Sequence, residues 1–442
     1  MAFSNDFLWG AASAAYQIEG AYKQDDKGLG IWDALSEGHV KHGDNGNIAC
    51  DHYHRYKEDI EIMKKMGLKA YRFSVSWPRV MPAQGVVNEK GIQFYKDLVK
   101  EIKDADMVPM CTLFHWNLPM WIYEKGGWLC EAVSEYFEEY TQIVVDALSD
   151  MVDMWMTVNE ASTFIGAGYL DGIHAPFESV EMGTPETDER ICRLTKNVLL
   201  SHGKAVRVIR KSSKLVPKVG IAMDGTLFIP WEETEEEISK AKKLTFPDIL
   251  HHKPTNWWMD PIVHGRFHQQ LEMYLNEEDK TIIHQPLDFM GYNCYQANNY
   301  DENNGHNPYV YPGMPRTAMD WPITPDALYW AVRFFQERYH LPIMITENGM
   351  ANIDYVMSDG KIHDPQRIEY LKGYLKGLKR AVDEGYNVIG YQYWSIMDNF
   401  EWAEGYDKRF GLIYIDYQTQ ERILKESAYW YANVIKTNGK DL

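Results

Sequence analysis

Short segments rich in β-branched and aromatic residues alternate with longer segments of helical periodicity along the whole chain, and this alternation most constrains the fold. The expected strands cover residues 7–12, 70–76, 108–114, 154–158, 218–223, 289–293, 343–346 and 389–394. Between them, apolar residues recur at three- and four-residue spacing, which predicts helices such as 53–66, 91–105, 134–148, 194–210 and 365–384. Parallel strands joined by helical crossovers form either an open doubly wound sheet or a closed barrel.

Two features favour the closed barrel. A nucleotide-binding open sheet usually carries a GxGxxG or P-loop motif after its first strand. Neither motif follows the first expected strand of this chain. The eight expected strands also match the count of a (β/α)8 TIM barrel, which is an α/β fold. No linker or change of composition divides the chain, so we expect a single domain over residues 1–442 with elaborated loops at the C-terminal face of the strands. The loop 297–325 is too long for a mere connector and is expected to border a substrate mouth.

The charge balance limits the partners of this chain. Its 45 Lys and Arg residues face 64 Asp and Glu residues, which gives a formal net charge of −19. Such a surface repels nucleic-acid phosphates and anionic membranes, so neither is expected as a partner. No stretch reaches the run of about 18 apolar residues that a membrane-spanning helix needs. The acidic run 232–237 is expected to be the solvated start of a helix.

The cysteines and the N-terminal segment indicate the compartment. Five cysteines, an odd number, are scattered along the chain without CxxC spacing, which argues against both a disulfide framework and a zinc cage. Acidic Asp6 and Glu19 interrupt the N-terminal segment, which therefore does not read as a secretory signal. We expect a cytoplasmic protein.

Polar and aromatic residues gather just past the expected strands, where an α/β barrel carries its chemistry. Carboxylates follow two of the strands and a third lies shortly beyond the last strand, and they are accompanied by amides, a histidine and indoles. Tryptophan faces stack on the C–H surfaces of sugars, while amides and carboxylates pair with sugar hydroxyls, so a neutral polyhydroxylated ligand is indicated. These residues are Gln17, Trp77, His115, Trp116, Asn159, Glu160, Asn293, Tyr295, Glu347, Asn348, Trp394, Glu401 and Trp402.

Six motifs in order carry a resemblance to a known family: FLWGAASAAYQIEGA, AYRFSVSWPRVMP, TLFHW, TVNE, ITENG and DNFEWAEGYDKRFGL. Over essentially the entire chain, the sequence resembles glycoside hydrolase family 1, the β-glucosidase family. The resemblance implies a single (β/α)8 barrel and a retaining β-glycosidase that needs no cofactor. Its expected substrates are β-glucosides and short gluco-oligosaccharides, from which it would remove terminal non-reducing β-D-glucosyl residues through a covalent glycosyl-enzyme intermediate.

The resemblance assigns Glu347 of ITENG as the nucleophile and Glu160 of TVNE as the general acid/base. Retaining glycosidases hold these two carboxyl groups roughly 5 to 5.5 Å apart. Glu160 must begin protonated, whereas Glu347 must stay ionised. The supporting residues implied by the family pattern are Arg72 and Tyr295 beside the nucleophile, Asn159 for the sugar 2-hydroxyl, and Asn293.

The family pattern also implies a substrate-binding set, with Trp394 as the floor on which the sugar stacks: Gln17, His115, Trp116, Trp394, Glu401, Trp402 and Phe410. Members acting on 6-phosphorylated sugars carry serine, lysine and tyrosine at positions 401, 408 and 410. Only Lys408 is present here, and a carboxylate at Glu401 would repel a phosphate, so unphosphorylated sugars are expected. Met120 and the segment 257–267 are expected to line or support the outer subsites, or to be purely structural.

The chain departs from the family pattern at two positions, and these departures are expected to affect the reaction rate and the preference for the leaving group. Ala161 stands where most relatives have proline, and Asn117 stands where aspartate is common. Neither removes a reacting group.

Several alternatives remain beside this interpretation. A metal-dependent hydrolase using the histidines at positions 52, 54, 251 and 252 is disfavoured, because none joins an acidic ligand at zinc-site spacing, so no metal is expected. A non-catalytic sugar-binding barrel is the least favoured, since both carboxylates are retained. A β-galactosidase or β-fucosidase, a transglycosylase and a homo-oligomer stay open.

Overall fold

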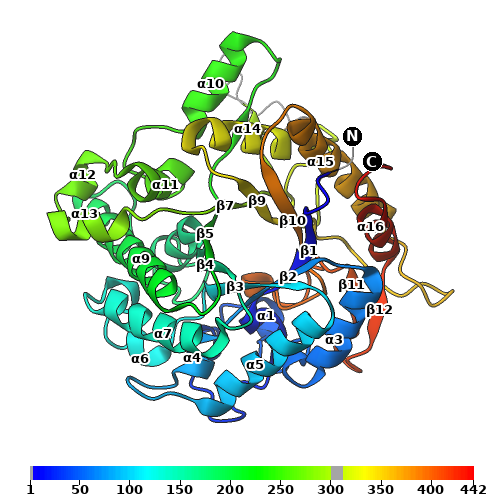
Figure 1. The fold of residues 1–442 in the computed structure, drawn as a ribbon, viewed down its shortest axis with the longest axis horizontal. Coiled ribbons are helices and arrows are strands. Elements are labelled where there is room, and N and C mark those ends of the chain that lie inside the picture. The colour runs from blue at the N-terminus through cyan, green and yellow to red at the C-terminus, as the bar shows by residue number, and fades with distance from the viewer. Residues whose placement is uncertain (1–2, 300–311) are drawn as a thin grey trace.

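The computed structural model describes residues 3–299 and 312–442, and Figure 1 shows its central strands inside a ring of helices. The eight barrel strands are β1 (Leu8–Ala12), β2 (Ala70–Ser74), β3 (Val108–Phe114), β4 (Met154–Asn159), β5 (Lys218–Met223), β7 (Met290–Asn293), β9 (Ile343–Asn348) and β10 (Val388–Trp394). They pair in the order β1-β10-β9-β7-β5-β4-β3-β2, all in parallel, and the pairing of β1 with β10 closes the ring. The expected closed (β/α)8 barrel is confirmed, and each predicted strand bound lies within two residues of the observed one.

Long helices form the outer layer of the barrel. They are α3 (His52–Met66), α5 (Glu89–Asp104), α7 (Val133–Leu148), α9 (Pro185–Ser212), α14 (Ala327–Tyr339), α15 (Pro365–Asp383) and α16 (Glu426–Thr437). The connection between β5 and β7 carries α10 (Glu235–Thr245), α11 (Thr255–His264), α12 (Gln269–Glu272) and α13 (Glu277–Ile283). Of these, α10 projects outward from the ring, at the top of Figure 1.

Short elements fill the loops. The short helices are α1 (Ala15–Ile18), α2 (Ile31–Leu35), α4 (Trp77–Val80), α6 (Met120–Tyr123) and α8 (Ala161–Ile165), and single turns lie at Lys41–Gly43, Gly127–Leu129, Gly166–Leu170 and Trp402–Glu404. Two small sheets pair β6 (Phe228–Ile229) with β8 (Asn298–Asn299), and β11 (Ile413–Ile415) with β12 (Arg422–Leu424).

Capping residues explain where two of the helices begin. The backbone N–H of Thr187 donates to the Thr184 hydroxyl at 3.2 Å, so α9 starts at Pro185 rather than at the predicted residue 194. Its first turn is polar, and the apolar periodicity begins only further along the helix. The acidic run does begin a helix, as expected: Thr234 caps α10, and three glutamates in its first turn complement the helix dipole.

The barrel interior below the strand ends is filled by side chains from all eight barrel strands or the residues directly before them. Four of the residues that meet there are methionines, namely Met110, Met154, Met156 and Met344, and Phe289 joins them. Flexible thioether side chains fill the irregular centre of a barrel well. The lower barrel is therefore a packed core, and an open cavity lies toward the carboxyl ends of the strands.

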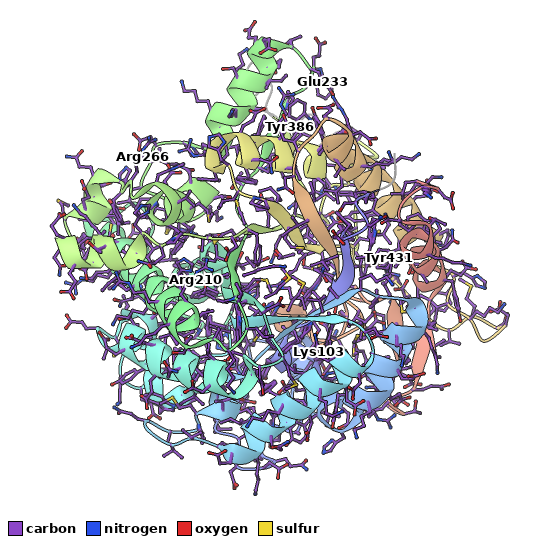
Figure 2. All side chains as sticks on the ribbon, in the orientation of Figure 1. Lys103, Arg210, Glu233, Arg266, Tyr386 and Tyr431 are labelled. Carbon is purple, nitrogen blue, oxygen red and sulfur yellow. The ribbon has the colours of Figure 1, made fainter. Side chains whose placement is uncertain are left out.

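A second apolar layer lies between the strands and the surrounding helices. Figure 2 shows Tyr431 between α16 and the strands, and its hydroxyl donates to the carbonyl of Gly10 in β1 at 2.8 Å. The two ends of the described chain lie side by side in Figure 1. The Trp9 indole donates to the Asn438 side chain at 2.9 Å and so links these ends. Among the residues that the structure describes, no helix has the length and apolar character needed to cross a membrane.

Candidate active site

A pocket of about 460 Å³ opens at the carboxyl ends of the strands. Residues that end or follow β3, β4, β5, β7, β9 and β10 line it, together with Met319 and Trp321 from the described part of the long loop that was expected to border the mouth. Residues 300–311 of this loop lie outside the described residues, so for them the expectation stays a prediction. Because many loops converge here, the pocket presents polar groups from sequence segments that lie far apart.

Two glutamates face this pocket from the ends of β4 and β9, which lie three positions apart in the ring of strands. Glu160 directly follows β4, and its backbone N–H donates to the carbonyl of Ala222 in β5 at 2.8 Å. Glu347 lies in β9, where it pairs in register with Asn293 of β7. The Asn293 side chain donates to Glu160 Oε1 at 2.7 Å and also interacts with the Glu347 carboxylate. The barrel therefore brings the two carboxylates to one asparagine.

Arg72 and Tyr295 stabilise the ionised form of Glu347. Arg72 Nη1 donates to Oε1 at 2.6 Å, and the Tyr295 hydroxyl donates to Oε2, also at 2.6 Å. Burial raises the pKa of Glu347 above its usual value, and the Arg72 charge and these two hydrogen bonds limit that rise without reversing it. Both carboxylate oxygens thus receive a charge-assisted hydrogen bond.

The surroundings of Glu160 favour its neutral form. Burial raises the pKa of this carboxyl well above its usual range, and the negative charges of Asp224 and Glu347 raise it further. The hydrogen bond from Asn293 and the charge of Arg72 oppose the rise with smaller effects. Two negative neighbours thus add to the rise in the pKa of Glu160, whereas Arg72 and Tyr295 limit the rise at Glu347, and this difference suits Glu160 as a proton donor and Glu347 as a nucleophile.

A network of hydrogen bonds runs beneath the two glutamates. Arg72 Nη2 donates to Asn159 Oδ1 at 2.6 Å, which directs the Asn159 amide nitrogen toward His115 Nε2 at 3.2 Å. Burial, together with the Arg72 charge, lowers the pKa of His115 well below its usual value, so the imidazole is neutral. Because Nε2 accepts, Nδ1 carries the proton, and it is buried without a partner among the described residues. It is therefore available as a donor.

The far end of the pocket combines an amide with a third carboxyl group. Gln17 Nε2 donates to Asn399 Oδ1 at 3.0 Å, to the Phe400 carbonyl at 2.8 Å and to Glu401 Oε2 at 3.3 Å. Its Oε1 is buried and has no partner among the described residues. Burial and, to a lesser degree, the charge of Glu347 raise the pKa of Glu401 to about 8.

Aromatic side chains form the remaining wall. The His115 ring lies nearly parallel to Trp394 and to Trp402, with centroids 5.8 and 6.0 Å apart and interplanar angles of 18°. The rings of Trp116 and Trp402 lie 4.7 Å apart, and Phe410 packs 6.0 Å from Tyr295. Indole faces beside paired amide and carboxylate groups can hold a sugar ring by stacking while its hydroxyls are satisfied.

The predicted residues divide into lining and supporting ones. The residues that line the pocket are His115, Trp116, Glu160, Asn293, Tyr295, Glu347, Trp394, Glu401, Trp402 and Phe410. Gln17, Arg72 and Asn159 are buried just behind the lining and contact it through the hydrogen bonds above. Met120 and the segment 257–267 do not line the pocket, and the Trp257 indole instead donates to Thr195 of α9 at 2.9 Å. Within this segment, however, the Trp258 indole donates to the carbonyl of His252, a lining residue, at 2.7 Å, so a supporting role for the segment stays a prediction.

Sequence reasoning missed the outer part of the pocket. Asp224, the first residue past β5, lines it together with His252 and Lys253, which precede α11. Its position at a strand end was the signal that could have identified Asp224. Thr346 was also missed: its hydroxyl donates to Asn293 Oδ1 at 2.6 Å, next to Glu347. In the described part of the chain, no three His, Cys, Asp or Glu side chains are grouped as metal ligands.

Comparisons with known proteins agree with this architecture. The family model described as glycosyl hydrolase family 1 matches residues 1–440. Two curated relatives, each named beta-glucosidase A, come from Acetivibrio thermocellus and Thermotoga maritima. They are 41% and 40% identical to this chain, and the alignments cover 99% of it and 99% and 98% of the relatives. A solved structure, the beta-glucosidase from Thermotoga maritima in complex with glucoimidazole, matches with a TM-score of 0.88 and 40% identity over 99% of both chains. The chain therefore belongs to glycosyl hydrolase family 1.

Proposed function

We propose that this protein is a retaining β-glucosidase that releases terminal non-reducing β-D-glucosyl residues from β-glucosides and short gluco-oligosaccharides. The observation that carries the proposal is the pair of buried glutamates at one asparagine, with donors on both oxygens of Glu347 and two negative neighbours beside Glu160. Relatives named beta-glucosidase at about 40% identity support the substrate class.

In the first step, Glu347 attacks the anomeric carbon from the face opposite the leaving group. A carbon–oxygen ester bond forms while the glycosidic C–O bond breaks, and its electron pair goes to the leaving oxygen. Glu160 gives its proton to that oxygen, so the aglycone departs as a neutral alcohol. The raised pKa of Glu160 is what supplies this proton near neutral pH.

In the second step, water replaces the enzyme at the anomeric carbon. Esterification removes the negative charge of Glu347, which is one of the two charges that hold the proton on Glu160. Glu160 can then act as a base, take a proton from the incoming water and regenerate Glu347 as the free carboxylate. Two inversions give a product with the β configuration of the substrate.

The supporting residues act on these two groups or on the sugar. Arg72 and Tyr295 hold the Glu347 carboxylate in its ionised form, and Asn293 orients Glu160. Asn159, fixed by Arg72, is assigned to the sugar 2-hydroxyl, where a hydrogen bond strengthens as the oxocarbenium-like transition state forms.

The glucose ring is assigned to the inner end of the pocket. Trp394 forms the floor for stacking, and the free acceptor of Gln17 and the free donor of His115 are suited to sugar hydroxyls. The remaining contacts are assigned to Trp116, Glu401, Trp402 and Phe410. Burial raises the pKa of Glu401 to about 8, so this group offers a sugar 6-phosphate no positive charge when it is neutral and repels the phosphate when it is ionised; unphosphorylated substrates are therefore favoured.

We further propose that the protein works in the cytoplasm. All five cysteines are free thiols, and this suits the reducing cytoplasm.

Proton NMR of an aryl β-D-glucoside digest tests substrate and stereochemistry together. We expect β-glucose to appear first and then to mutarotate, whereas α-glucose as the first product would refute retention. Replacement of the nucleophile, Glu347→Gly, should abolish turnover, and added azide should restore it with formation of α-glucosyl azide. Replacement of the acid/base, Glu160→Gly, should instead give β-glucosyl azide from an activated substrate. The opposite anomers would reverse the two assignments.

A further inference from the structure

A third carboxylate, Asp224, is built into the site next to Glu160. Asp224 is the first residue after β5, and its Oδ2 accepts hydrogen bonds from Ser162 Oγ at 2.5 Å and Thr163 Oγ1 at 2.6 Å. Both donors lie in α8, the helix that begins directly after Glu160. Since the Glu160 N–H also donates to β5 at 2.8 Å, these bonds fix the position of Asp224 relative to Glu160.

We propose that Asp224 is a positioning residue whose fixed negative charge keeps Glu160 protonated until the glycosidic bond breaks. This inference rests on the proposed role of Glu160 as the acid/base. Asp224 itself does not react and acts only through Glu160.

The hydrogen bonds show which of the two groups holds the proton. Asp224 receives two hydroxyl donors on one oxygen, whereas Glu160 receives the single amide donor of Asn293. Donors stabilise the charged form of a carboxyl group, so the negative charge belongs to Asp224 and the proton to Glu160. Burial raises the pKa of Asp224, and the Ser162 and Thr163 hydroxyls oppose that rise.

The charge of Asp224 is not neutralised locally. Its Oδ1 is buried at the pocket lining without a hydrogen-bond partner among the described residues, and no basic side chain described there forms an ion pair with it. An unpaired charge in a partly desolvated site acts over a longer range than an exposed one. Accordingly, burial is the largest cause of the raised pKa of Glu160, and Asp224 comes next, ahead of Glu347.

The other titratable groups around Glu160 do not cancel this effect. Arg72 of β2 is bound to Glu347 and Asn159, and it lowers the pKa of Glu160 less than Asp224 raises it. The imidazoles of His115 and His252 are neutral, because burial lowers the pKa of both, that of His252 to about 3. Tyr292 and Tyr295 have raised pKa values and stay neutral, and Lys253 is exposed to solvent, so its charge is screened.

The charge of Asp224 has a consequence for the second step. When Glu347 is esterified its charge disappears, but that of Asp224 remains. Glu160 therefore stays more basic than it would be beside a neutral residue, and a more basic carboxylate accepts the proton of water more readily. Asp224 thus moves the working range of the enzyme toward higher pH in both steps.

The test is the pH dependence of kcat/KM for Asp224→Asn. Asparagine keeps the size of the side chain and one oxygen for Ser162 and Thr163, but it removes the charge. We expect the basic limb, which reports Glu160, to move down by about one pH unit, while the acidic limb, which reports Glu347, moves less. Asp224→Glu retains a charge and should keep the basic limb near that of the wild type.

The matched control is Asp171→Asn, which removes an exposed charge from the rim of the same pocket. Solvent screens the charge of Asp171, so the basic limb of the pH profile of Asp171→Asn should not move. An unchanged limb in Asp224→Asn, or an equal shift in Asp171→Asn, overturns the inference. If Asp224→Asn fails to fold, Asp224→Ser supplies a second neutral variant with the same expected shift.

A further variant separates this inference from the proposed function. With 2,4-dinitrophenyl β-D-glucoside, whose leaving group needs little acid help, Glu160→Gln should remain measurable and should lose the basic limb. If Glu160→Gln keeps the limb of the wild type, the proposed role of Glu160 fails. If Glu160→Gln loses the basic limb but Asp224→Asn keeps it at the wild-type pH, only the proposed role of Asp224 fails.

Discussion

The hydroxyl of Thr346 determines which way the amide of Asn293 faces, and replacing it by valine tests the hydrogen-bond network behind the acid/base. Thr346 is fully buried in β9 and donates to Asn293 Oδ1 at 2.6 Å. With its oxygen engaged, Asn293 must direct its nitrogen toward Glu160 Oε1, at 2.7 Å, and toward Asn159 Oδ1, at 3.1 Å. Valine has nearly the same shape and lacks only the donor.

The expected effect follows from the lost donor. A neutral hydrogen bond contributes about 1 kcal/mol, so without it the amide is free to turn its oxygen toward Glu160. An oxygen in that position accepts a hydrogen bond from protonated Glu160 and no longer stabilises its anion. Replacing a donor to the anion by an acceptor for the neutral form amounts to about 1.4 kcal/mol, which raises the pKa of Glu160 by about one unit.

The assay is kcat/KM against pH for Thr346→Val, with Thr346→Ser as the control that keeps the hydroxyl. We expect the basic limb of the valine variant to move up by about one pH unit, while the serine variant follows the wild type. This direction is opposite to that expected for the loss of the Asp224 charge, so general damage to the site cannot produce both. Equal profiles for valine and serine, or a downward shift for valine, would refute the reasoning.

The remaining predictions concern the nucleophile and the stability of the fold. Tyr295→Phe removes a 2.6 Å donor from Glu347, so the pKa of Glu347 should rise and the acidic limb of kcat/KM should move upward by about one pH unit; an unmoved limb would contradict the contact. Lys425→Met should destabilise the protein by about 3–5 kcal/mol in denaturant unfolding, because fully buried Lys425 lies 2.6 Å from both Asp354 and Asp398. Burial raises the pKa of Asp354, but Lys425 and its other partners lower the pKa overall. The contribution of ionised Asp354 to stability is therefore complete above about pH 4 and is lost as the pH falls through the lowered pKa. Lys425→Met should therefore unfold at a higher pH than the wild type during acid titration followed by circular dichroism, and identical acid transitions would contradict this.

The barrel was predictable from the sequence because both faces of its parallel strands are buried. Segments such as 108–114 and 218–223 are short, apolar and bounded by helical periodicity, and their observed bounds agree with the prediction. Helix ends were less predictable. The first turn of α9 carries Glu186 and Asp188, so it contributes nothing to the apolar pattern, and its start is marked only by local signals, the Thr184 cap and the proline that follows it.

The sequence predicted where the site lies and which residue types form it, because the strand ends of a barrel converge. The pairing of side chains was not, since it depends on rotamers and on three-dimensional neighbours. Asn159 was identified from its position at a strand end and Arg72 from the resemblance, but the sequence could not tell whether they would line the pocket or lie behind it. The contact of Thr346 with Asn293 and the two hydroxyls at Asp224 depend on side-chain directions that no linear pattern encodes.

The strand that closes the ring has a consequence for how the protein is made. The partners of β1 are β2, which follows it closely, and β10, whose register joins Leu8 to Gly390 and Ala12 to Trp394. During synthesis at about 5–20 residues per second, some 20–80 seconds separate the emergence of these two strands. For that time the growing chain carries unpaired strand edges that invite pairing with other chains. A ribosome-bound nascent chain that has not yet exposed β10 should thus be inactive and should depend on chaperones for protection.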